Sequence, residues 1–217
     1  MAAIALLNPN TNAATTAAMV EIAAGTAPAG ISIRGVTAGF GADLITTPAA
    51  LAVAANAVLA AAGAFSEDAA VIVAAFGDPG RERLAEALGI PVVGIAEAAM
   101  AEAAALSRGR FAIATTTPDL AEDIRARATA YGHGQALVAV RTPAGDAAAL
   151  MADPAAVEAV LEDLCRQAIE EDGARAVVIG GGPLARAARA LAPRFAVPIV
   201  EPIPAAVRMV CARLGVA

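Results

Sequence analysis

The stretch Ala70-Val-Ile-Val-Ala-Ala-Phe-Gly-Asp-Pro-Gly80 decides the fold, because an apolar run ends in a glycine turn that leads into a helix-forming segment. Its core, Val71-Ile72-Val73, has no polar position, which is typical of a parallel strand buried on both faces. A second stretch of the same kind, Ala176-Val-Val-Ile-Gly-Gly-Gly-Pro183, also precedes a helical segment. Parallel strands joined by helices are therefore the expected unit of this chain.

Outward from these two stretches, short β-branched runs alternate with longer Ala-rich runs along the whole chain. The expected strands are 3–7, 31–36, 70–75, 91–94, 110–115, 135–140, 176–180 and 198–201, and the expected helices are 13–24, 47–65, 80–88, 95–107, 119–131, 153–171, 184–191 and 204–214. The alternation predicts an α/β fold with parallel-type sheets flanked by helices. Thr117-Pro118 and Asp153-Pro154 each predict a capping side chain followed by Pro in the first helical turn.

The two halves of the chain repeat each other. Equivalent strands lead into polar loops at Asn8 and Thr115, and later strands lead into glycine turns that align Ala75 with Gly181. The strands that follow the next helices align Pro91 with Pro198. Any two strand–helix–strand units look alike in an Ala-rich chain, but three matching units in the same order favour duplication of a whole lobe.

The repeat predicts two lobes related by a pseudo-twofold axis. We expect the first lobe to span 1–97 with the C-terminal helix 204–217, and the second to span 98–203. Ligands of open α/β sheets bind beyond the carboxyl ends of the strands, so a cleft between the lobes is the expected binding site.

The candidate substrate-binding residues are those that follow strands. They are Asn8, Asn10, Thr11, Ala75, Phe76, Gly77, Thr115, Thr116, Thr117, Gly181, Gly182 and Pro183. Asn and Thr at such places either cap the next helix or offer neutral hydrogen-bonding groups to a ligand. Glycines let backbone amides approach a ligand closely.

Two carboxylates are candidate catalytic groups. Asp78 lies in the turn after the third strand, where it either caps the helix that follows or acts in acid–base chemistry, and Glu201 ends the last strand. Glu97, early in a helix, offers a further base or orienting group.

Cofactor and metal sites are not expected. The glycine triplet does not form a dinucleotide-binding fingerprint, and the chain has no Lys for a Schiff base or a phosphate-binding loop. The single His133 lies in a loop that leads into a strand, and one His without neighbouring ligands does not make a zinc site. Cys165 and Cys211 fall in helical segments and are expected to be buried apolar fillers in a reducing compartment.

The charge and composition of the chain limit the classes of partner that it is expected to bind. A net charge of −6 with 3% aromatic residues argues against nucleic acid. The apolar run 49–65 is interrupted by Asn56 and is short for a membrane span, so we expect a helix of a folded domain rather than a membrane anchor. The N-terminal run Met1–Leu7 has no basic region and is interpreted as a strand, which predicts a cytoplasmic protein. A small-molecule substrate, anionic or amide-containing, is the expected partner, and the Ala-rich helices are compatible with a homo-oligomer.

These motifs together resemble the aspartate/glutamate/hydantoin racemase superfamily, most closely its hydantoin and allantoin racemase branch. The resemblance rests on Asn8-Pro9-Asn10-Thr11, on Phe76-Gly77-Asp78-Pro79-Gly80, on Gly94-Ile-Ala-Glu97 and on the strand end Val178-Ile-Gly180. It implies two α/β lobes, no cofactor, and two cysteines that act on opposite faces of an acidic carbon, one removing a proton and the other delivering one.

The sequence departs from the family pattern at both implied cysteine positions, which are Ala75 and Gly181 here. Neither residue can carry a proton, so the two-thiol mechanism does not transfer. The remaining interpretations are an enzyme of this superfamily that uses other groups for cofactor-independent acid–base chemistry, a hydrolase, lyase or decarboxylase on the same scaffold, and a small-molecule binding protein without catalysis.

Overall fold

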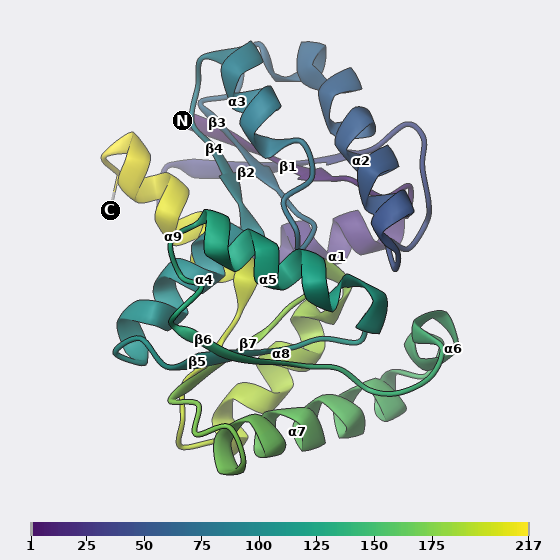
Figure 1. Ribbon diagram of the computed structural model, residues 1–217. Helices are drawn as coiled ribbons and strands as arrows, with labels where there is room; N and C mark the ends of the chain where they lie inside the picture. Colours follow the sequence, from purple (N-terminus) through teal and green to yellow (C-terminus); the bar gives the residue numbers. More distant parts are fainter. Residues whose placement is uncertain (1, 217) are drawn as a thin grey trace. The chain divides into compact units, whose positions relative to one another are not determined.

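The computed structural model describes residues 2–216, which form two compact units. The first unit takes in the chain up to Ile45, Ala49–Ala98 and the chain from Ile203 onward, and the second takes in Thr46–Pro48 and Ala99–Pro202. Each unit is built around its own four-stranded parallel sheet (Figure 1).

The sheet of the first unit has the order β2-β1-β3-β4. Its elements in chain order are β1 (Ala2–Asn8), α1 (Ala13–Ala24), β2 (Ile31–Thr37), α2 (Pro48–Ala60), the 3-10 helix η1 (Ala62–Phe65), β3 (Ala70–Val73), α3 (Arg81–Leu88), β4 (Val92–Gly94), the first residues of α4 (Ile95–Leu106) and α9 (Pro202–Leu214). One face of the sheet packs on α2 and α3, where Val71 and Val73 belong to one core cluster with Val58 and Leu84. In Figure 1 these two helices lie together on one side of the strands.

The sheet of the second unit has the equivalent order β6-β5-β7-β8. Its elements are the rest of α4, β5 (Phe111–Ala114), η2 (Pro118–Leu120), α5 (Ala121–Ala130), β6 (Leu137–Arg141), α6 (Ala147–Met151), α7 (Pro154–Glu170), β7 (Ala176–Ile179), η3 (Gly182–Leu184), α8 (Ala185–Leu191), η4 (Ala192–Arg194) and β8 (Ile199–Val200). One face packs on α7 and α8, where Val177 and Ile179 belong to one core cluster with Leu161 and Ala188.

The predicted fold is confirmed. All eight expected strands are present, and both sheets are parallel with their first strand placed second in the order. Every residue of β3 and β7 is buried, as expected for strands covered on both faces. The apolar run 49–65 forms α2 and η1, and no helix within residues 2–216 is long and apolar enough to cross a membrane.

Some local predictions differ from the structure. The short helix α6 is absent from the sequence prediction, and it begins where Asp146 accepts a hydrogen bond from the Ala148 amide. Asp153 caps α7 as predicted, but Thr117 makes no capping hydrogen bond. The prediction of a Thr117 cap is wrong because its hydroxyl lies 3.2 Å from the Thr115 hydroxyl instead.

Both cysteines are buried and free, on α7 and α9, as the sequence predicts. Burial raises the pKa of the Cys165 thiol to about 12, and the Glu162 carboxylate adds to this shift. Burial also raises the pKa of the Cys211 thiol. Both thiols therefore stay protonated at neutral pH and act as apolar core groups.

The Cys165 thiol predicts a loss of stability in alkali. Because its folded-state pKa is raised above the unfolded value of about 8.5, its contribution is fully present below that value and is lost as pH rises toward 12. We expect the wild type to lose about 1–2 kcal/mol more between pH 8 and pH 10 than Cys165→Ala. Urea unfolding of both proteins at each pH measures the difference, and equal pH dependence would contradict the assignment.

Candidate functional site

The loop after β1 is held by a buried network of amides and hydroxyls. Asn8 is 1% exposed, and its Nδ2 donates to Asn10 Oδ1 at 2.7 Å and to Thr16 Oγ1 at 3.0 Å. Its Oδ1 accepts from the Asn10 backbone N–H at 3.2 Å. Asn12 caps α1 by accepting from the Thr15 amide. Asn12 therefore has the capping role that the sequence left open for this segment, and Asn8 holds the loop through its side-chain hydrogen bonds.

Asn10 differs from the other residues of this loop in its side-chain amide nitrogen, Nδ2. Its Oδ1 accepts from Asn8 Nδ2 and, at 2.9 Å, from the Asn12 backbone N–H. Two donors on one atom fix that atom as the oxygen and fix the amide plane. Among the hydrogen bonds of residues 2–216, none uses Nδ2 of Asn10, although the residue is only 5% exposed. The geometry thus fixes the orientation of a neutral N–H₂ group that makes no hydrogen bond within the described residues.

Two threonines outside the predicted set complete the network. Thr16 Oγ1 lies 2.7 Å from Thr37 Oγ1, and Thr37 ends β2 directly beside Asn8 in the sheet register. The spacing of Thr16, four residues after Asn12 on α1, is the signal that could have found it. Thr37 is brought in by strand pairing, which local sequence does not reveal. Thr11, which is in the predicted set, is half-buried and donates its backbone N–H to Ala42 O at 3.1 Å.

The turn after β3 depends on a buried carboxylate. Asp78 is fully buried, has a left-handed backbone with φ +49°, and accepts from the Ala96 amide at 2.9 Å and the Glu97 amide at 2.8 Å. It therefore caps α4 rather than α3, the helix that directly follows it. The Asp78 carboxylate occupies the place that a side chain at Gly94 would take, since an added Cβ would lie 2.0 Å from Asp78 Cγ.

The other predicted residues of this turn precede the buried carboxylate in sequence. Ala75 is half-buried, Phe76 is 7% exposed, and Gly77 has φ +135°. The Asp78 amide donates to Ala75 O at 3.0 Å, which closes the turn. The cap on α4 and the fold of the turn are therefore coupled through one residue.

Gly94→Ala should be strongly destabilising because the new methyl group and the Asp78 carboxylate cannot share one space. We expect a loss of about 3 kcal/mol in the free energy of unfolding. Gly63→Ala, where a Cβ meets nothing within 4 Å, is the matched control and should stay near the wild type. Adding Asp78→Ala to Gly94→Ala should cost less than the sum of the two single changes. Additive costs would contradict the steric explanation.

In the second unit, the three predicted threonines follow β5. Thr115 and Thr116 are buried, and Thr116 Oγ1 lies 3.6 Å from Met151 Sδ of α6. Thr115 Oγ1 and Thr117 Oγ1 are 3.2 Å apart. The hydroxyls therefore cluster at the carboxyl end of β5, and Thr117 does so without capping the helix that follows.

The glycine turn after β7 has a backbone that only glycine adopts easily. Gly181 has φ +152°, and a Cβ there would lie 3.1 Å from two atoms of Leu184. Gly182 is buried and Pro183 is exposed, and both belong to η3. Gly181 and Ala75 are thus unlike in conformation although they are equivalent in the repeat.

This difference predicts unequal tolerance for cysteine at the two positions. Ala75→Cys should leave the melting temperature close to that of the wild type. Gly181→Cys should cost about 1–3 kcal/mol through backbone strain and contact with Leu184. Trimming the neighbour in Gly181→Cys/Leu184→Ala should not restore full stability, because the strained φ remains. Equal stability of the two single variants would contradict the structure.

The second predicted catalytic carboxylate, Glu201, directly follows β8, which ends at Val200. Its Oε2 accepts from Arg189 Nε at 3.1 Å, and its side chain is 20% exposed. Glu97, the further candidate, is paired with Arg81 and Arg213. Of the two carboxylates predicted to be catalytic, Glu201 is accessible to solvent and Asp78 is not.

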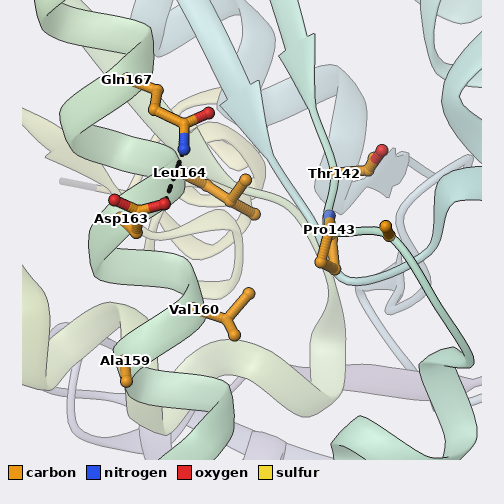
Figure 2. Close-up of a pocket in the computed structure, with 8 residues that line it drawn as sticks. Thr142, Pro143, Ala159, Val160, Asp163, Leu164 and Gln167 are labelled. Atoms are coloured by element: carbon orange, nitrogen blue, oxygen red, sulfur yellow. Dashed lines mark hydrogen bonds between the residues drawn. The ribbon is translucent and has the colours of Figure 1, made fainter.

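Two cavities of the described units have linings that include none of these loop residues. One of about 470 Å³ is lined by Thr142, Pro143, Ala144, Ala159, Val160, Asp163, Leu164 and Gln167 (Figure 2). Gln167 Nε2 donates to Asp163 Oδ2 at 2.6 Å within this lining. The other, of about 280 Å³, lies between α9 and the segment after α1. Neither is lined by a residue predicted to bind substrate, and residues 2–216 contain no group of three His, Cys, Asp or Glu arranged to hold a metal.

Comparison with known proteins agrees with this architecture. The Asp/Glu/Hydantoin racemase family matches residues 4–210. The chain belongs to this family. A hydantoin racemase from Rhizobium meliloti is 32% identical over 98% of this chain and 88% of that protein. A hydantoin racemase from Paenarthrobacter aurescens is 30% identical over 64% of this chain, and the match spans 59% of that protein.

A solved allantoin racemase from Klebsiella pneumoniae is 33% identical and has a TM-score of 0.91, covering 100% of this chain and 90% of that one. The resemblance to the hydantoin and allantoin racemase branch is therefore confirmed, and a small-molecule substrate is consistent with these relatives. The roles of the individual loop residues remain predictions.

Proposed function

We propose that this protein is a racemase of the hydantoin and allantoin branch, acting on a small cyclic amide such as a 5-substituted hydantoin or allantoin. The observation that carries the proposal is the match along the whole chain to a hydantoin racemase and to the structure of an allantoin racemase. The loops after β1, β3, β5 and β7 are the proposed substrate-binding segments, because ligands of parallel α/β sheets bind beyond the carboxyl ends of the strands.

The chemistry of these loops supports an uncharged substrate. Residues 8–12, 75–78, 115–117 and 180–183 contain one ionisable side chain, Asp78, and both of its oxygens accept from amides of α4. An amino acid zwitterion binds most strongly where a cation meets its carboxylate and an ionised acceptor meets its ammonium group. A hydantoin ring instead presents carbonyls and N–H groups, which suit the Asn10 amide donor and the threonine hydroxyls.

Proton transfer must use groups other than the two thiols that the family resemblance implies, since Ala75 and Gly181 hold no proton. We assign the acid–base step to Glu201, whose carboxylate would take the proton from the carbon between the ring carbonyl and nitrogen. The resulting enolate would regain a proton on its opposite face from water held by the polar loops. The hydroxide left behind would take the proton from the Glu201 carboxyl group, which restores the carboxylate and the water. Hydroxyls at the carboxyl end of β5, in the same unit as Glu201, would stabilise the enolate oxygen. Asp78 is assigned to holding the turn, because its carboxylate is buried and bonded.

The test is exchange in D₂O. Incubation with single enantiomers of 5-benzylhydantoin, 5-methylhydantoin and allantoin should give deuterium at the stereogenic carbon together with loss of optical rotation, faster than in protein-free buffer. L-aspartate and L-glutamate should not exchange. Glu201→Gln should slow turnover about 10²- to 10⁴-fold, as expected for loss of a general base. Asn10→Ala should lower affinity, and Asn56→Ala, an exposed residue of α2, is the matched control.

A second function is favoured by one observation. Glu201 is paired with Arg189 and Asp78 caps α4, so neither carboxylate predicted to be catalytic is free of a partner. A binding protein that has lost the chemistry would show a raised melting temperature with these hydantoins and no exchange.

For the racemase proposal, deuterium exchange into L-aspartate or L-glutamate but into none of the hydantoins would contradict the uncharged substrate class.

A further inference from the structure

Glu97 is the junction of four elements of the first unit. Its Oε2 accepts from the Gly94 amide at 3.3 Å and lies 3.4 Å from Arg81 Nη1. Its Oε1 accepts from Arg213 Nη2. The Glu97 side chain is 15% exposed, so these partners replace most of its water. The carboxylate therefore links the end of β4, the start of α3, the start of α4 and the last turn of α9.

Arg213 holds this junction from the far end of the sequence. Besides Glu97, its Nη1 donates to the backbone oxygen of Val92, the first residue of β4, at 3.2 Å, and its Nη2 lies 3.5 Å from Met209 Sδ. The planar guanidinium thus spans the two ends of a strand–helix connection, from Val92 to Glu97. A lysine does not reproduce both contacts, because its ammonium group is a single point charge.

The same junction fixes the turn that carries part of the proposed site. The Glu97 backbone N–H is one of the α4 amides that donate to the Asp78 carboxylate, and the Asp78 amide donates to Ala75 O. The Arg81 amide donates to Asp78 O at 3.3 Å, which adds a second path from Glu97 to the turn. A shift in the first turn of α4 therefore moves Asp78, and with it the preceding residues 75–77.

We propose that Arg213 is a positioning residue, which acts through Glu97 and Asp78 to hold the 75–78 turn in its binding geometry. The proposal rests on the proposed function for its catalytic consequence, but its structural part does not. Substituting Arg213 removes one of the two arginines that pair with Glu97. It also removes the hydrogen bond from α9 to the Val92 backbone oxygen of β4. The turn then samples other arrangements, and small misplacements of binding groups reduce turnover steeply.

The experiment compares Arg213→Met with Arg34→Met. Arg34 makes a similar set of bonds in the same unit, to Asp68 and to Ala64 O, but none to the junction. With 5-methylhydantoin, we expect Arg213→Met to lower kcat about tenfold with KM changed less than about twofold, and Arg34→Met to change neither. Arg213→Lys, which keeps the charge, should fall between Arg213→Met and the wild type.

A structural readout tests the proposal whether or not the protein turns over hydantoins. Amide hydrogen exchange at Ala96 and Glu97 should be about tenfold faster in Arg213→Met and unchanged in Arg34→Met. Glu97→Gln/Arg213→Met should exchange no faster than the faster of its two single variants, because both act through one contact. Exchange in Arg213→Met equal to that in Arg34→Met would overturn the role of Arg213. Absence of hydantoin turnover in the wild type, with the exchange difference present, would overturn the proposed function only.

Discussion

Burial of both faces of the inner strands of each sheet is the constraint on which the rest of the structure depends. In β3 and β7 no residue is exposed, so neither strand can carry an unpaired polar side chain along its length. Polar groups are admitted where a strand ends, as at Asn8, Thr37 and Thr115. Because parallel strands all end at one edge of their sheet, the polar side chains of each unit are gathered by topology. The burial of the strand interiors therefore also determines that the polar candidate residues lie at the strand ends.

The polar side chains gathered at the strand ends must still find hydrogen-bond partners when they are buried. The Asn8 amide donates to Asn10 and Thr16, and the Asp78 carboxylate accepts from two amides of α4. Unpaired buried polar groups are costly, so these bonds hold the loops in one arrangement without a ligand. A loop fixed beforehand loses little conformational entropy when a ligand binds. The neighbours of Asn10 already orient its unused N–H₂ group, which is what the proposed contact with a ligand requires.

The sequence is sufficient to predict the strands, because a run such as Val177-Val-Ile179 has few other stable environments. The sequence is insufficient where a side chain has two possible hydrogen-bond partners nearby, or where its partner lies far away along the chain. Thr117 has the pattern of a helix cap, yet its hydroxyl meets that of Thr115, two residues away. The Asp78 carboxylate accepts from amides that lie 18 and 19 residues further along the chain, beyond the helix that follows it. Arg213 meets Glu97 across 116 residues, a contact that no local pattern contains.

The two units have the same strand order, but the turns that follow their equivalent strands are stabilised in different ways. After β3 the turn is held by a side chain, Asp78, and the position of Ala75 has no conformational demand for glycine. After β7 the turn is held by backbone conformation, and Gly181 at φ +152° admits glycine far better than any other residue. Duplication fixes at which strand ends the polar loops lie, whereas each turn has its own means of support. Under the proposed function, recognition by neutral amides and hydroxyls persists while the groups that move protons change, because the proposal assigns the two tasks to different residues.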